Sequence, residues 1–60
     1  MFTIKVSTTH NTEEYYPAFS SDFSARYVAR GFVDLPCVAR ALVIDNETGE
    51  ITWDSATLDF

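Results

Sequence analysis

The chain has 60 residues, of which nine are acidic and four basic, for a net charge of -5 at neutral pH. A chain of this length forms at most one domain and buries only about 60% of its unfolded surface, so its stability is marginal. The acidic balance disfavours nucleic-acid backbone binding, and no apolar run approaches the roughly 20 residues that span a bilayer.

The first predicted element is a strand over residues 2–8. Its side chains alternate between apolar and polar, and many are β-branched, which is typical of a half-buried strand. The apolar positions are Phe2, Ile4 and Val6. The alternation stops in residues 9–19, where Asn11, two glutamates and Pro17 indicate a loop.

A helix is predicted to begin near Asp22, with Ser20 or Ser21 as its N-cap. Helical spacing places one set of apolar residues on a core face: Ala25, Val28, Ala29, Phe32 and Leu35. The opposite face carries charged and aromatic residues: Phe23, Arg26, Tyr27, Arg30 and Asp34. The helix either ends at Arg30 with Gly31 as its cap or continues to Leu35. A helical turn starting at Asp34 and Pro36 is a third option.

Residues 40–54 predict a β-hairpin. If Asp45 pairs with Glu50, the four residues between them form the loop, and Gly49 takes its left-handed position. In that register Ile44 opposes Ile51 and Leu42 opposes Trp53, so that these four side chains form the face covered by the helix. An apolar streak then remains on the outer face, and it would suit a second copy of the chain or a partner. The streak consists of Cys37, Ala39, Ala41 and Val43. The last six residues either extend the second strand or form a tail carrying Leu58 and Phe60.

Together these elements predict one α+β domain over residues 1–60, with a three-stranded antiparallel sheet and one helix on one face, in the order β-α-β-β. The N-terminus lacks the basic start and long apolar stretch of a secretory signal, which predicts a cytoplasmic protein.

Few residues suit catalysis or metal binding. Cys37 and His10 are the single cysteine and the single histidine, so neither an internal disulfide nor a Cys/His zinc site is expected. Residues 45–50 lack the ligand spacing of a calcium loop. We therefore expect no catalytic, cofactor or metal site, and the protein is not expected to be an enzyme.

Two surfaces are candidates for partner binding. Residues 41–60 contain five acids and no Lys or Arg, so that carboxylates along the hairpin could occupy a basic groove meant for a phosphate backbone. The acids chosen are Asp45, Glu47, Glu50 and Asp54. The second surface is the helix face with Phe23, Tyr27 and Arg30, because aromatic and Arg side chains are frequent interface anchors. Its arginines, with Arg40, also form a predicted weakly basic stripe.

The segment VIDNETGEITW, the small size, the acidity and the lack of catalytic residues resemble the very short acidic α+β proteins encoded by bacteriophages and prophages. These include anti-CRISPR proteins and inhibitors of host DNA-processing enzymes. The resemblance implies an inhibitor that blocks a basic or nucleic-acid-binding surface of a larger host protein, in the host cytoplasm.

Two other functions stay open. One is a structural or assembly protein that forms a homodimer through the outer sheet face, at Ala39, Ala41 and Val43. The other is a nucleic-acid binder that uses Arg26, Arg30 and Arg40.

Overall fold

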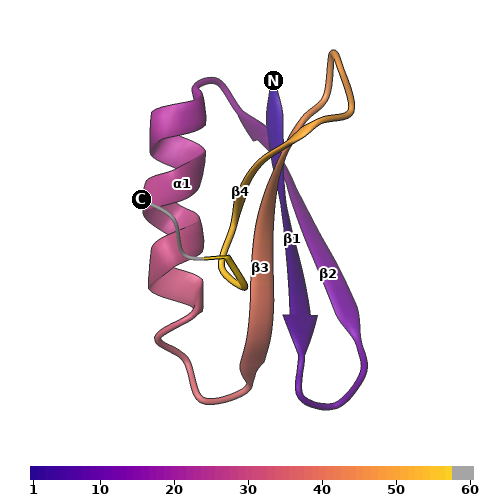
Figure 1. Cartoon of the computed structure of the whole chain (residues 1–60), viewed down its shortest axis with the longest axis vertical. Helices are drawn as coiled ribbons and strands as arrows, with labels where there is room; N and C mark the ends of the chain where they lie inside the picture. Colours follow the sequence, from indigo (N-terminus) through magenta and orange to yellow (C-terminus); the bar gives the residue numbers. More distant parts are fainter. Residues whose placement is uncertain (58–60) are drawn as a thin grey trace.

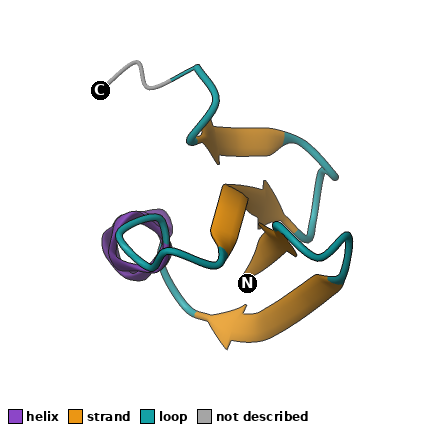
Figure 2. Ribbon diagram, turned by 90° about the horizontal axis from the view of Figure 1, so that it is seen from below, coloured by secondary structure: helices purple, strands orange, loops and turns teal. Residues whose placement is uncertain are grey.

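The computed structural model describes residues 1–57, which form a four-stranded antiparallel sheet with one helix packed on one face (Figure 1; Figure 2). The α+β class is thus confirmed, but the sheet has four strands instead of three. In chain order the elements are β1 (Phe2–Thr8), β2 (Glu13–Phe19), α1 (Asp22–Phe32), β3 (Val38–Asp45) and β4 (Ile51–Asp54). The strands lie side by side in the order β2-β1-β3-β4, so that β1 and β3 are central.

Strand β2 occupies most of the segment that was predicted to be a loop, and that prediction was wrong. The strand pairs with β1 from Glu13, opposite Ser7, to Phe19, opposite Phe2. Pro17 is tolerated because β2 is an edge strand, where a missing backbone N–H breaks no sheet ladder. A bulge adds one residue to β2 near Ala18, whose φ is 82°. Proline and bulge together interrupt the alternation by which a strand is recognised in sequence.

Helix α1 begins where the sequence predicted but ends elsewhere. Ser21 is the N-cap, and its Oγ accepts a hydrogen bond from the Ser24 N–H at 3.2 Å. The helix ends at Phe32, so both lengths considered were wrong, and Gly31 lies within the last turn. Val33 closes the helix in an ordinary right-handed conformation, and its N–H reaches the Ala29 carbonyl at 3.3 Å. The alternative helical turn from Asp34 is also wrong, because β3 begins at Val38.

The core lies between α1 and the facing side of the sheet. Ala25 and Ala29 are fully buried, and their small side chains let the helix approach the sheet closely. The sheet contributes larger side chains to the same cluster: Ile4, Val6, Val43 and Trp53, with Ala41 between them. Phe32 closes one margin by stacking on Tyr16, with ring centroids 4.9 Å apart. Val28 and Leu35, expected in the core, are instead exposed.

The β3–β4 hairpin matches its predicted turn. The Asp45 N–H donates to the Glu50 carbonyl at 2.8 Å, and Gly49 adopts a φ of 78° as the loop requires. Ile44 opposes Ile51 as predicted. Beyond that pair the register slips, because Thr52 is an extra residue on β4 and Trp53 comes to lie opposite Val43. The predicted Leu42–Trp53 pair was therefore wrong.

The bulge at Thr52 places Ile51 and Trp53 on opposite sides of the sheet, while the pairing of β3 with β1 turns Ala41 and Val43 toward the helix. Trp53 and Val43 are buried under α1, whereas Ile51 is 54% exposed on the opposite side. Ala41 is also fully buried, so the predicted outer streak of Cys37, Ala39, Ala41 and Val43 does not form. Only two members of the predicted streak, Cys37 and Ala39, are exposed. A single-residue slip exchanges the two faces of a strand, which is why one bulge changes the assignment.

This assignment of faces predicts unequal effects of the same substitution at two isoleucines. Ile4→Val removes a methylene from a fully buried side chain and should lower the free energy of unfolding by about 1 kcal/mol. Ile51→Val is the matched control, and it should change that free energy by only a few tenths of a kcal/mol. Urea unfolding followed by circular dichroism measures both. Equal losses would place both side chains in the core and contradict the observed register.

Candidate protein-binding surfaces

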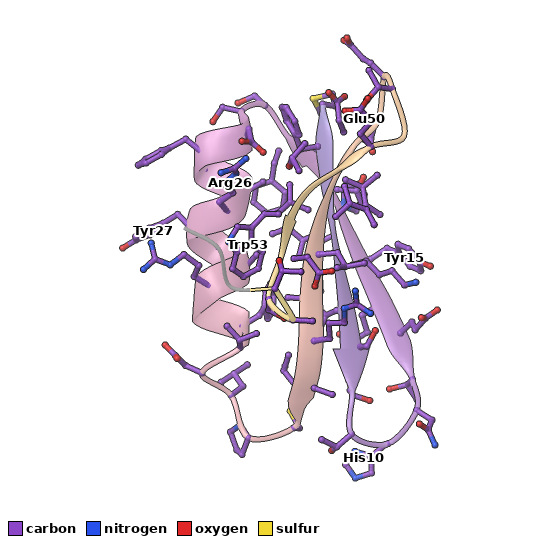
Figure 3. The ribbon with its side chains drawn as sticks, in the orientation of Figure 1. His10, Tyr15, Arg26, Tyr27, Glu50 and Trp53 are labelled. Atoms are coloured by element: carbon purple, nitrogen blue, oxygen red, sulfur yellow. The ribbon has the colours of Figure 1, made fainter. Side chains whose placement is uncertain are left out.

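The predicted anchors of α1 come together at one hollow. Phe23 and Tyr27 are one turn apart and are 81% and 73% exposed. With Arg26, Arg30 and Trp53 they line a hollow of about 200 Å³. Figure 3 shows Arg26 on the helix near Trp53 of β4, and Tyr27 projecting outward from the helix. The structure thus brings together the three predicted anchors, Phe23, Tyr27 and Arg30. Trp53, which was predicted only as part of the helix-covered sheet face, lines the same hollow.

A second hollow continues along β4. It has a volume of about 390 Å³ and shares Arg26 and Trp53 with the first. Its remaining lining comes from the edge strand and the turn after it: Ile51, Thr52, Asp54 and Thr57. The two hollows thus adjoin at Arg26 and Trp53, and we term them together the α1–β4 groove.

Three side chains fix the walls of this groove to each other. The Arg26 guanidinium lies 2.7 Å from an Asp22 carboxylate oxygen through Nε, and its Nη2 donates to the Thr52 carbonyl at 2.9 Å. The Thr52 hydroxyl donates to the other Asp22 oxygen at 2.6 Å. Asp22 and Arg26 are four residues apart on the helix, and Thr52 is the bulged residue of β4. This Asp22–Arg26–Thr52 clamp therefore couples α1 to an edge strand that is only four residues long.

The predicted acidic surface divides into two parts. Asp45, Glu47 and Glu50 lie at the β3–β4 turn, where Asp45 also accepts the Glu47 N–H at 2.9 Å. Figure 3 shows Glu50 at the end of the molecule opposite His10. We term these three residues the acidic hairpin tip. Within residues 1–57 none of the three forms an ion pair with a lysine or arginine.

Asp54, the fourth predicted acid, lies away from the tip and is neutralised by Arg40. The guanidinium of Arg40 binds both carboxylate oxygens, with Nε donating to Oδ1 at 3.0 Å. This contact holds the pKa of Asp54 below its ordinary value and raises that of Arg40. Because Arg40 belongs to the sheet side facing away from α1, it does not join Arg26 and Arg30, and the predicted basic stripe is not formed.

The sheet side away from α1 is not covered by any helix or strand among residues 1–57 (Figure 2). We term it the outer sheet face. Lys5 and Glu13 form an ion pair across it at 3.0 Å, and hydrogen bonding to that carboxylate raises the pKa of Lys5. The register places these apolar side chains on the same face: Tyr15, Leu42, Ile44 and Ile51.

The residues considered for chemistry are not assembled into a site. His10 lies exposed in the β1–β2 turn, and Cys37 is exposed just before β3. Among residues 1–57 no three His, Cys, Asp or Glu side chains are placed to hold a metal ion. In the same part of the chain no helix is long and apolar enough to cross a membrane. Leu58, Asp59 and Phe60 lie outside the described residues.

Sequence reasoning missed the roles of Arg26 and Trp53. Arg26 carries a weak signal, since an Asp four residues before an Arg is a typical helical ion pair. Trp53 lies on the helix-covered face as predicted, but nothing in the sequence indicated that it would line a hollow with residues of α1.

No protein-family model, curated protein or solved structure matches this chain. The properties of the surfaces therefore have to be argued from their residues.

The Asp54–Arg40 pair predicts a specific dependence of stability on pH. Because the pKa of Asp54 is lowered by folding, the pair contributes fully above the ordinary carboxyl pKa of 3.8 and is lost as the pH falls through the lower folded value. Asp54→Asn keeps an acceptor for the Ala56 N–H but removes the charge. The variant should unfold at lower urea than wild type at neutral pH, and this difference should disappear well below pH 3.8. Glu47→Gln at the tip is the control and should show no such difference. A wild-type advantage that persists in strong acid would contradict this account.

Proposed function

We propose that the protein acts by binding a larger protein and not by catalysis, and that the acidic hairpin tip directs it to a basic surface. The observation that carries the proposal is the arrangement of charge. Lys5, Arg26 and Arg40 are each engaged by a carboxylate of the chain, whereas Asp45, Glu47 and Glu50 project together from one turn. Such a cluster attracts and orients a basic partner from a distance of about a Debye length.

The partner we propose is a protein whose basic surface normally binds nucleic acid. Carboxylates at the tip would take the place of backbone phosphates, while the aromatic residues of α1 supply the apolar contact that charge alone does not provide. This is how the small acidic phage inhibitors that the sequence resembles are expected to act, in the cytoplasm of the host. The arginines do not favour direct nucleic-acid binding, since Arg26 and Arg40 lie on different sides of the sheet and are both ion-paired.

The proposal predicts that capture of the partner depends on the tip. Immobilised wild-type protein and a Glu47→Gln/Glu50→Gln variant are exposed to the same bacterial lysate, and bound proteins are quantified by mass spectrometry. Loss of close charge pairs should reduce the amount of basic partner captured by about tenfold. Raised salt should reduce wild-type capture in the same direction.

The matched control is Glu14→Gln/Asp34→Asn, which removes the same net charge outside the tip. Both residues are exposed, one in β2 and one in the α1–β3 connection. Retained capture by this control with loss in the tip variant supports the proposal. Equal capture by all three proteins would overturn the electrostatic part of it.

A second candidate function is homodimerisation through the outer sheet face. The observation that favours it is that this side of the sheet is uncovered, with Tyr15 57% and Ile51 54% exposed. A second copy would now meet Tyr15, Ile44 and Ile51, since Ala41 and Val43 belong to the core and Leu42 is only 8% exposed.

If the protein forms this homodimer, the wild-type protein should have twice the mass of one chain, and Ile51→Glu should restore the mass of the monomer. A charge at Ile51 cannot be buried between two sheets without a large desolvation cost, whereas in the monomer it stays in water. Size-exclusion chromatography with light scattering measures the mass. Tyr27→Ala, on the helix, is the control and should leave the dimer intact. A wild-type monomer throughout the accessible concentration range would exclude this candidate.

A further inference from the structure

The side of α1 that faces away from the sheet has an apolar ridge. Phe23, Tyr27 and Gly31 follow one another at four-residue spacing, so they lie in one row along the helix. Phe23 and Tyr27 are 81% and 73% exposed, and Gly31 is exposed as well. Ala25 and Ala29, which pack on the sheet, lie on the opposite side of the helix. We term the row of three the α1 ridge.

Neither ordinary structural reason for a glycine applies at Gly31. Its φ does not lie in the left-handed region, whereas that of Gly49 does. Among residues 1–57 no atom lies within 4 Å of the position that a Cβ of Gly31 would occupy, apart from its chain neighbours and the helix backbone itself. Glycine is also among the least favourable residues in a helix. What Gly31 provides is open space on the surface for a group from outside the chain.

The α1 ridge is complementary to itself under a two-fold axis. In a symmetric dimer, a contact from one residue to another in the second copy is always made in both directions. If two α1 helices cross antiparallel at Tyr27, the residue four before it lies opposite the residue four after it. Phe23 of each copy then lies over Gly31 of the other, and the two Tyr27 rings meet at the axis. A projecting aromatic ring thus meets an open position twice.

The charge distribution permits this contact. The α1 ridge brings no charged side chain to the centre of the interface, although each chain carries a net charge of -5. Figure 3 shows Tyr27 projecting outward from the helix, away from Glu50 of the acidic hairpin tip. Antiparallel helices also place the positive dipole end of one beside the negative dipole end of the other. The repulsion that remains is between net charges, and salt weakens it.

The available area fits a reversible dimer. Burying about 150 Å² from each of four aromatic side chains would remove about 600 Å² from solvent. Val28, beside the ridge and 37% exposed, adds to this area. Specific protein interfaces begin near roughly 1,000 Å² in total. The contact is close to that lower limit, so we expect weak association that depends on concentration.

We propose that α1 pairs antiparallel with α1 of a second copy of this chain, with each Phe23 packed over Gly31 of the other copy and Tyr27 at the centre. The surface is distinct from the outer sheet face, which lies on the other side of the sheet. The dimer does not depend on the proposed function. Where both hold, the second copy competes with the larger partner for the aromatic residues of α1.

Sedimentation equilibrium of the purified protein at rising concentration measures the dimer dissociation constant. Phe23→Ala removes the projecting ring and Gly31→Leu fills the open position, so each should weaken the dimer by about tenfold or more. Gly31→Leu also makes the ridge more apolar, and it would therefore strengthen a non-specific hydrophobic association. Ile51→Glu, on the outer sheet face, is the control and should leave the dissociation constant unchanged. Circular dichroism establishes that each variant is folded.

An equimolar mixture of the two ridge variants tests the antiparallel orientation. In a mixed dimer, the intact Phe23 of one chain lies over the intact Gly31 of the other. The leucine introduced at position 31 then lies over the space that the Phe23→Ala substitution leaves. The mixed dimer should therefore form about tenfold more tightly than either variant alone. Parallel helices would not bring these positions together.

The outcomes separate this inference from both proposed functions. A wild-type monomer at all accessible concentrations, or a dimer that Gly31→Leu leaves unchanged or strengthens, overturns it. A dimer that is lost with Ile51→Glu but retained by both ridge variants assigns the contact to the outer sheet face and also overturns it. A mixture that associates no more tightly than its components overturns the antiparallel pairing. Partner capture through Glu47 and Glu50 is measured independently, so its failure leaves the dimer standing.

Discussion

The bulge at Thr52 is the constraint on which the rest of the structure depends. It adds one residue to β4, so that Ile51 faces outward while Trp53 faces the helix. A regular hairpin would have placed both on one side. The same bulge frees the Thr52 carbonyl and hydroxyl for Arg26 and Asp22, which fasten the short edge strand to α1. The burial of Trp53 beside an exposed Ile51, the clamp and the groove are therefore consequences of one local irregularity.

The helix contributes small side chains to the core and large ones to the surface. Ala25 and Ala29 let the helix lie close to the sheet, and the volume between the layers is filled mainly from the strands, by Ile4, Val43 and Trp53. Phe23 and Tyr27 lie on the other face of the helix and stay in solvent at the rim of the groove. Small domains have small cores, and each exposed aromatic side chain is apolar surface that a partner can bury.

Ion pairs within the fold, more than position in the chain, decide which charged side chains are left to face a partner. Lys5, Arg26 and Arg40 are each held by a carboxylate, and Arg40 removes Asp54 from the acids that face a partner. Among residues 1–57, the acids of the hairpin tip form no ion pair with a lysine or an arginine. This concentrates the negative field at one end of the molecule, while the arginines that line the groove lie along the helix. Two surfaces of different chemistry thus coexist on a chain of 60 residues.

The local signals of the sequence determined the elements with strong periodicity or turn chemistry: β1, the N-terminus of α1 at Ser21, and the turn closed by Gly49. They also identified Phe23, Tyr27 and Arg30 as one exposed face. Strand β2 was hidden because Pro17 and a bulge disturb its alternation, which only pairing with β1 overrides. The outward side of Ile51, the exclusion of Asp54 from the tip and the clamp of Arg26 were decided by tertiary structure. Each depends on contacts between residues far apart in the chain, and a bulge that reverses a strand leaves no periodic trace in the sequence itself.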